Sequence, residues 1–97
     1  MNKNIFYVDE LGLPLGGKTT NIGLNIEWQG SPIKHPRGSG IQKGATVEDV
    51  IYAAIERLNF YQRDERFSAS GTAAALTHLY GALVRLDDDI QNGRPRL

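Results

Sequence analysis

The sequence lacks cysteine altogether, and this absence removes two kinds of site at once. Without thiols there is no disulfide framework of the kind that stabilises small secreted domains, and there is no thiolate metal site. The N-terminus also has neither a sufficiently long apolar segment nor the small-residue cleavage site of a secretory signal. We therefore expect a cytoplasmic protein.

The sequence also lacks an excess of charge of either sign, because 11 Lys and Arg residues balance 11 Asp and Glu residues. Proteins that bind nucleic acid in general use a positive surface to displace counterions. We therefore expect no general nucleic-acid binding. No apolar run approaches the roughly 20 residues that a helix needs to cross a bilayer, so we expect no membrane association.

What the sequence does contain is typical of a folded protein, since 40% of its residues are hydrophobic and 23% are charged. Its 97 residues predict a single domain. A domain this small leaves much of its apolar surface in water unless a partner covers it. We therefore expect a homo-oligomer, either a dimer or a larger assembly.

The first 45 residues predict a small antiparallel β ribbon followed by a basic loop. Residues 4–8 are rich in aromatic and β-branched side chains, which predicts a strand. Residues 13–18 and 30–44 are rich in glycine and proline, so we expect loops there. Residues 21–29 alternate polar and apolar side chains, which predicts a second strand with one apolar face, made of Ile22, Leu24, Ile26 and Trp28.

Residues 46–91 predict two amphipathic helices in an antiparallel hairpin. Thr46 and Asp49 have the spacing of a capping box at the start of the first helix, and Ser70 is a start signal after the turn at 63–66. Each helix has an apolar stripe at helical spacing: Val47, Val50, Ile51, Ala54, Ile55 and Leu58, then Ala73, Leu76, Leu79, Tyr80, Leu83, Leu86 and Ile90.

The predicted fold class is therefore α+β, with an N-terminal antiparallel ribbon packed on a two-helix hairpin in an oligomer. We expect one domain over residues 1–97. Its parts are the ribbon and basic loop at 1–45, the hairpin at 46–91, and a tail at 92–97.

Residues 12–19 read GLPLGGKT and match the phosphate-loop pattern G-x-x-x-x-G-K-[ST]. Such a loop works when a helix begins at its lysine, because the helix amides and dipole then face the phosphates. The residues after Thr19 are strand-like instead. Two interpretations follow, a hairpin connection that matches by chance and a nucleotide triphosphatase, and the sequence favours the first.

The turn between the two predicted helices gathers aromatic and arginine side chains. Planar rings can cover a base, and fixed cations can neutralise phosphates, so these residues could bind a nucleotide. The alternative is that the rings close the end of the apolar seam while the arginines are solvated. The residues concerned are Phe60, Tyr61, Arg63, Arg66 and Phe67.

Trp28 stands before a second candidate set, in which Lys34 and Arg37 could cover an anion. The alternative for Trp28 is that it packs the ribbon onto a helix. His35 and His78 lack a second histidine at ligand spacing, and no catalytic combination of serine, histidine and acid is evident. We expect no metal, no cofactor and no enzymatic activity.

Several short segments resemble a group of small phage proteins that share a helical hairpin, the anti-Thoeris and anti-CBASS sponges. The resemblance covers roughly residues 24 to 90, and the segments that carry it are 28–33, 44–51, 57–62 and 75–83. It implies a phage counter-defence protein of the infected host cell. In this group a β portion precedes two helices, and the assembled protein sequesters cyclic ADP-ribose isomers or cyclic oligonucleotides without catalysis.

The resemblance also implies which residues touch the ligand. An aromatic residue near the end of the first helix falls on Phe60 or Tyr61, and a polar residue near the start of the second falls on Thr72. This chain departs from the group before the second helix, where Ala69 and Gly71–Thr72 replace a Cys and a Glu-Asn pair. The missing Asn amide can both donate and accept hydrogen bonds. Because of this difference, the resemblance does not identify the ligand.

A second functional class fits the same sequence. The apolar stripe of a hairpin could block or scaffold a host or phage protein instead of binding a nucleotide. This interaction module would form a stable protein complex and would be indifferent to nucleotides.

Overall fold

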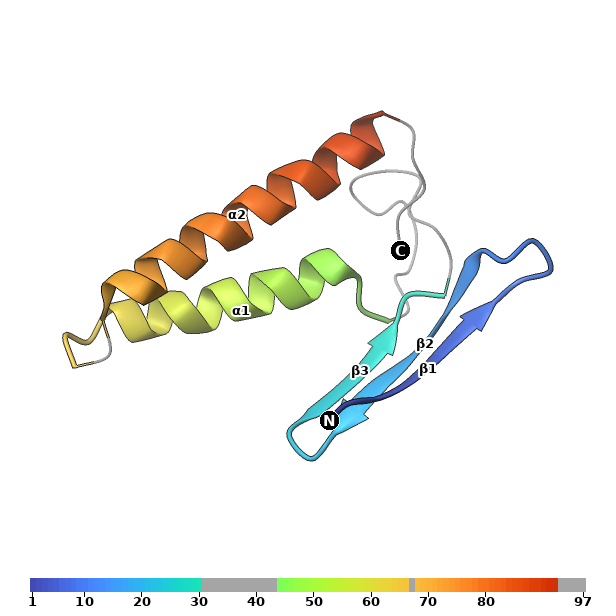
Figure 1. Cartoon of the computed structure of the whole chain (residues 1–97), viewed down its shortest axis with the longest axis horizontal. Coiled ribbons are helices and arrows are strands. Elements are labelled where there is room, and N and C mark those ends of the chain that lie inside the picture. The colour runs from blue at the N-terminus through green and yellow to red at the C-terminus, as the bar shows by residue number, and fades with distance from the viewer. Residues whose placement is uncertain (31–43, 67, 93–97) are drawn as a thin grey trace.

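The computed structural model describes residues 1–30, 44–66 and 68–92. It contains a three-stranded antiparallel sheet followed by a two-helix hairpin (Figure 1). The predicted α+β layout is therefore confirmed. The elements are β1 (Lys3–Val8), β2 (Pro14–Asn21), β3 (Leu24–Trp28), α1 (Val47–Gln62) and α2 (Ser70–Gln91).

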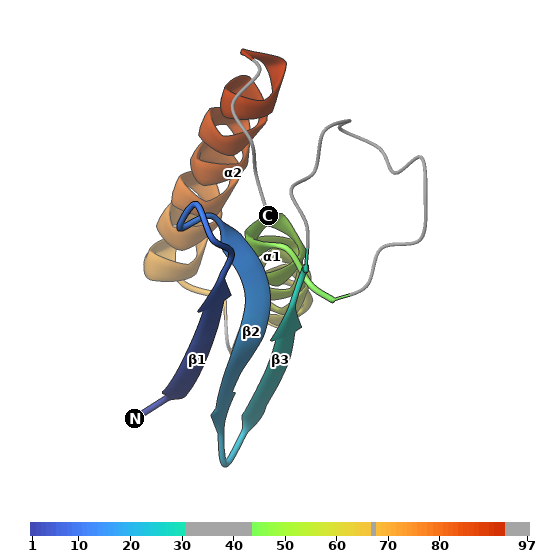
Figure 2. The same cartoon turned by 90° about the vertical axis from the view of Figure 1, so that its right-hand side faces the viewer.

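The sheet is a meander in the order β1-β2-β3, and the three strands lie side by side in Figure 2. The prediction of a loop at 13–18 is wrong, because β2 begins at Pro14. Gly17 has φ +139°, and a β-carbon there would overlap the carbonyl oxygen of Ile5. The glycine therefore allows β1 to approach β2 closely and does not mark a loop.

The second predicted strand is shorter than expected and excludes Ile22. Ile22 and Gly23 form the turn between β2 and β3, and the Asn21 side chain accepts a hydrogen bond from the Gly23 amide at 2.8 Å. Ile22 is fully exposed. Its predicted place on the apolar face is therefore wrong, because a short polar side chain stabilises a turn there.

One face of the sheet is apolar. Phe6, Gly17 and Trp28 are directly paired across the three strands, and so are Asn4, Thr19 and Ile26. Directly paired residues point to the same side, so this face is formed by Asn4, Phe6, Val8, Gly17, Thr19, Leu24, Ile26 and Trp28. We call it the apolar sheet face.

A small polar cluster is set into the apolar sheet face. The Trp28 indole donates to the Thr19 hydroxyl at 2.8 Å, and that hydroxyl donates to the Asn4 side-chain oxygen at 2.8 Å. Thr19 is only 6% exposed. The chain of bonds satisfies a buried hydroxyl and fixes the orientation of the indole ring.

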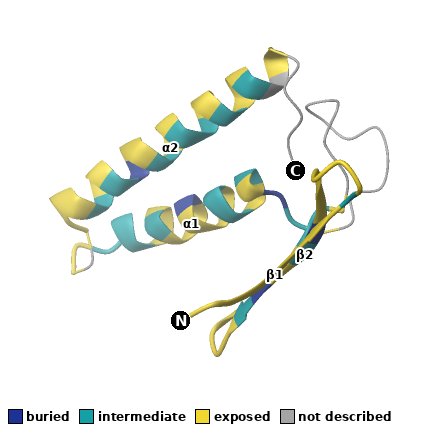
Figure 3. Cartoon of the chain, turned by 45° about the vertical axis from the view of Figure 1, so that its right-hand side comes forward, coloured by how far each residue is buried: buried dark blue, intermediate teal, exposed yellow. Residues whose placement is uncertain are grey.

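The helical hairpin begins as the sequence predicts. The Asp49 amide donates to the Thr46 hydroxyl at 3.1 Å, and the Thr46 amide donates to the Asp49 carboxylate at 2.9 Å, so the capping box is confirmed. The helices run antiparallel and diverge away from their connecting turn (Figure 1). Among the described hydrophobic residues, only Ile55 and Leu76 are buried, one from each helix (Figure 3).

The sheet does not pack on the hairpin, which differs from the expected arrangement. The hairpin extends away from the sheet, and it is the start of α1 that lies near the sheet (Figure 3). The two parts meet at Ala45, whose amide donates to the Glu27 carbonyl at 2.6 Å and whose carbonyl accepts from the Gln29 amide at 2.8 Å. Of the predicted stripes, Ile55 and Leu76 are buried, whereas Val47 and Tyr80 remain exposed.

The resulting surface is large and rich in apolar side chains. The chain exposes 7614 Å², whereas a compact monomer of its mass exposes about 5,500 Å². Large hydrophobic residues on both parts are at least partly open to water. No helix in the described part of the chain combines the length and the apolar character that crossing a membrane requires.

Candidate functional site

The predicted binding residues at the end of α1 lie together at the connecting turn of the hairpin. Phe60 and Tyr61 are in the last turn of α1, and Arg63 caps it, with its amide directed to the carbonyl of Phe60 at 3.3 Å. Phe60 is 55% exposed, while Tyr61 is half-buried. The turn therefore presents both rings partly to the solvent, that of Phe60 more than that of Tyr61.

Arg57 joins these two aromatic residues. Its guanidinium carbon lies 5.2 Å from the Phe60 ring centroid and 5.0 Å from the Tyr61 ring centroid, and its Nε donates to the Tyr61 hydroxyl at 3.0 Å. Both distances are within the range of cation–π attraction. The ring centroids of Phe60 and Tyr61 are 6.1 Å apart. We call Arg57, Phe60 and Tyr61 the tip cluster.

Arg57 is not among the binding residues predicted from the sequence, although its spacing from Phe60 and Tyr61 is a signal. Arg57 precedes Phe60 by three positions and Tyr61 by four, and residues at these spacings are neighbours on a helix surface. The residues of the turn do not by themselves include these helical neighbours on its N-terminal side.

The charge of Arg57 has no acidic partner among the described side chains. The ion pairs there join Lys18 to Glu27 and Arg66 to Asp64. Arg57 is instead held by aromatic rings and a hydroxyl, which orient its guanidinium without neutralising it. Such a cation remains available to an anion.

Arg66 differs from Arg57, because its guanidinium group already binds a carboxylate. Its Nη2 lies 2.7 Å from Asp64 Oδ2, and its Nε donates to Asp64 Oδ1 at 3.1 Å. This bidentate bond lowers the pKa of Asp64 and raises the pKa of Arg66. The same aspartate accepts from the Arg66 amide at 2.9 Å. Arg66 thus stabilises the turn.

The remaining predicted residues of the turn are placed as follows. Thr72 is half-buried in the first turns of α2, and Phe67 lies outside the described residues. The turn is also closed by the Ser68 hydroxyl, which donates to the Gln62 side chain at 2.7 Å. The two helices are linked further along by Asn59 and Tyr80, whose side chains approach to 3.5 Å.

Trp28 is not part of the tip cluster. It ends β3, near the start of α1 (Figure 1), and α1 has 16 residues, which span about 24 Å. Lys34 and Arg37 lie outside the described residues. Within one copy, Trp28 and the tip cluster are therefore at opposite ends of a helix.

The residues of the phosphate-loop pattern do not form such a loop. Gly12 lies in the turn between β1 and β2, where the Asp9 carboxylate accepts from the amides of Leu11 and Leu13. Lys18 and Thr19 lie within β2, and the next element is the strand β3. The chance match to a hairpin connection is therefore the interpretation that agrees with the structure.

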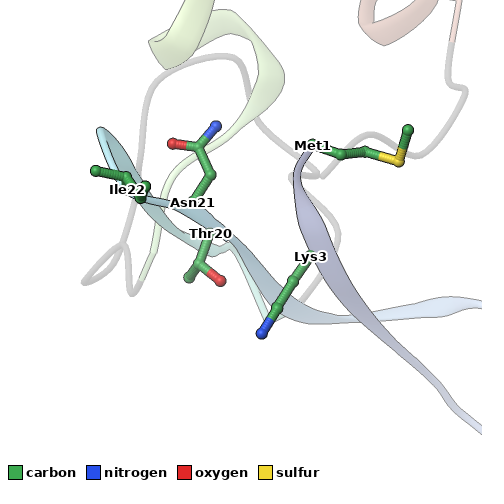
Figure 4. Close-up of a pocket in the computed structure, with 5 residues that line it drawn as sticks. All are labelled: Met1, Lys3, Thr20, Asn21 and Ile22. Carbon is green, nitrogen blue, oxygen red and sulfur yellow. The ribbon is translucent and has the colours of Figure 1, made fainter.

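Two cavities lie on the sheet. A groove of about 360 Å³ runs between the apolar sheet face and the start of α1, and its lining includes Phe6, Val8, Trp28 and Val47. A shallow cavity of about 660 Å³ lies at the β2–β3 turn, lined by Met1, Lys3, Thr20, Asn21 and Ile22. Figure 4 shows that these five side chains point in different directions and do not converge on one centre.

Comparisons with protein-family models, with curated proteins and with solved structures found no match to this chain. The described residues contain no group of three or more His, Asp or Glu side chains that could hold a metal ion. The tip cluster, with its oriented cation and open ring, is the arrangement best suited to a ligand.

Proposed function

We propose that this protein binds a cyclic nucleotide signal without converting it and thereby withholds it from a host effector. Cyclic ADP-ribose isomers and cyclic oligonucleotides are the ligand class, and phage counter-defence in the cytoplasm of an infected cell is the setting. The observation that carries the proposal is the tip cluster, in which an unneutralised guanidinium is held against two aromatic rings.

The chemistry of the tip cluster matches the two parts of such a ligand. The exposed face of Phe60 can stack on a base, and stacking on an aromatic side chain contributes about 1–3 kcal/mol per base. The fork of Arg57 can bind a phosphate in bidentate fashion. Arg63 is exposed at the same turn and adds a second cation.

The tip cluster has no part in either of the cavities described on the sheet, whereas binding sites for small molecules are usually concave. We therefore propose that a second copy completes the pocket, in line with the large apolar surface. Association through the exposed side of the hairpin, which includes Tyr52, Tyr80 and Val84, is the arrangement we favour.

Isothermal titration calorimetry against cyclic ADP-ribose isomers and cyclic di- and trinucleotides tests the proposal. Phe60→Ala removes the stacking surface, so we expect binding to weaken by about 5- to 150-fold. Ile22→Ala is the matched control, since Ile22 is a fully exposed apolar residue at the β2–β3 turn, outside the hairpin, and its loss should leave ligand affinity within twofold.

Two results would count against the proposal. No binding of any of these ligands at micromolar concentrations would remove it, and equal affinity of the wild type and the Phe60→Ala variant would remove the tip cluster from the site. Chromatography of the ligand recovered after denaturation should return it unchanged. A converted ligand would exclude pure sequestration.

The uncovered apolar sheet face favours a second candidate, a module that blocks or scaffolds another protein. Phe6 and Val8 are more than half exposed there, and exposed apolar patches often mark protein interfaces. This candidate predicts a stable complex with a host or phage protein that survives Phe60→Ala. It also predicts no heat of binding with any of the nucleotides.

A further inference from the structure

The outer edge of β1 is available for pairing with another strand. β1 is an edge strand of the sheet (Figure 2), and at the other edge the end of β3 is met by Ala45 through a parallel bridge. Natural edge strands are usually protected by charges, proline or a covering segment. β1 contains no proline, and its single charged residue is Lys3 at its start.

The side chains of β1 are also unusually open for a strand of large hydrophobic residues. Ile5, Phe6, Tyr7 and Val8 are 53%, 66%, 55% and 59% exposed, so both faces of the strand meet water. Covering a single face would protect only half of them. A strand added at the edge approaches side chains on both faces at once.

We propose that, at an interface separate from the exposed side of the hairpin, β1 pairs antiparallel with β1 of a second copy, centred on Phe6, to form one continuous sheet. A two-fold axis perpendicular to the sheet then relates the copies, and paired residue numbers sum to about 12 in this register. Phe6 faces the partner's Phe6. Ile5 faces the partner's Tyr7, and Lys3 faces the partner's Asp9.

This register makes every cross-strand pair favourable or neutral. It places an aromatic pair on the axis, a β-branched residue opposite an aromatic one on each side, and opposite charges at each end. Centring the pair on Ile5 would instead set Lys3 opposite the partner's Tyr7 and Asn4 opposite the partner's Phe6. That arrangement loses both the ion pairs and the pair of phenylalanines.

The proposed occupant is a second copy because this register gives complementary cross-strand pairs, and the symmetry adds a joined apolar face. A two-fold axis perpendicular to the sheet keeps like faces on the same side, so the apolar sheet faces of the two copies join across the boundary. Val47 lines the same groove as Phe6 and Val8, so α1 begins on this side. Both hairpins therefore leave the joined sheet on its apolar side.

Cysteine crosslinking tests the pairing directly, because the chain has no native cysteine. Residues that face each other across an antiparallel pair have Cα atoms about 4.5–5.5 Å apart, which is within the range of a disulfide. Under mild oxidation the full-length Phe6→Cys variant should become mainly a covalent dimer. Asn25→Cys, exposed on β3, is the matched control and should stay at background.

Two outcomes of the crosslinking would overturn the proposal. One is a Phe6→Cys variant that crosslinks no faster than Asn25→Cys, and the other is an Ile5→Cys variant that crosslinks faster than Phe6→Cys. The second outcome would place the axis on a different residue and would remove the pairing of Lys3 with the partner's Asp9.

Sedimentation velocity gives an independent test without a covalent bond. Phe6→Lys sets two like charges on the axis, so we expect the β1 contact to weaken at least tenfold, while Asn25→Lys leaves it unchanged. Circular dichroism of both variants should match the wild type, because Phe6 is exposed in one copy. A Phe6→Lys variant that associates like the wild type would contradict the pairing. If the Phe6→Lys variant fails to fold, the cysteine crosslinking decides whether the pairing exists.

Discussion

Removal of the Thr19 hydroxyl tests how the sheet is stabilised. Thr19→Val keeps a β-branched side chain of similar shape but deletes the group that accepts from the Trp28 indole and donates to Asn4, both at 2.8 Å. Asn4 is exposed, so its oxygen can bond to water instead. Trp28 is half-buried, and its indole N–H would be left without its acceptor.

The expected loss of folding stability follows from this difference between the exposed Asn4 and the half-buried Trp28. A buried donor that loses its partner costs about 1–3 kcal/mol of folding free energy. Because one of the two bonds is replaced by water, we expect the free energy of unfolding to fall by about 1–2 kcal/mol. With a urea dependence of about 1–1.5 kcal/mol per molar for a chain of this size, the midpoint should fall by about 1 M.

Urea unfolding followed by tryptophan fluorescence reports on the affected part of the sheet, because Trp28 is the one tryptophan of the sequence. Thr19→Ser keeps the hydroxyl and should recover most of the loss. Thr20→Val changes the neighbouring residue, whose side chain points to the other face of β2, and should stay within about 0.5 kcal/mol. A Thr19→Val variant as stable as the wild type would refute the reasoning.

Two further predictions concern the hairpin. Ile55→Ala should lower the free energy of unfolding by about 2–5 kcal/mol, because it deletes one of the two buried hydrophobic side chains. Urea unfolding followed by the helical circular dichroism signal measures this loss of stability. A loss smaller than that caused by Tyr52→Ala would contradict the assignment of Ile55 to the core. Arg66→Gln should raise the pKa of Asp64 toward its ordinary value, since the guanidinium lowers it. In the wild type the lowered pKa means that the Asp64–Arg66 pair favours the folded turn above the ordinary aspartate pKa and loses this effect as pH falls through the lowered value. Carbon-detected NMR titration measures the shift, and an unchanged pKa would show that the pair does not persist in solution.

The hairpin could be predicted from the sequence because its signals are local. The capping box at Thr46 and the helical spacing of the apolar residues each specify a helix without reference to distant parts of the chain. β2 could not be predicted in the same way. Its glycines resemble those of a loop, and the reason for Gly17, the close carbonyl of Ile5, lies on another strand.

The candidate site was predicted in part. Phe60, Tyr61 and Arg63 do lie together at the turn, as their closeness in sequence indicates. The different situations of Arg57 and Arg66 could not be predicted from residue types, because both are arginines near aromatic residues. Which one is neutralised depends on the position of Asp64, and this is set by the backbone of the turn.

The connection through Ala45 has a consequence for how this protein can vary. Among the described residues, two main-chain hydrogen bonds at Ala45 connect the sheet to the segment that leads into the hairpin, and the energetic effects of changes far apart in the two parts tend to add. Substitutions at the exposed turn of the hairpin should therefore leave the strand register unchanged.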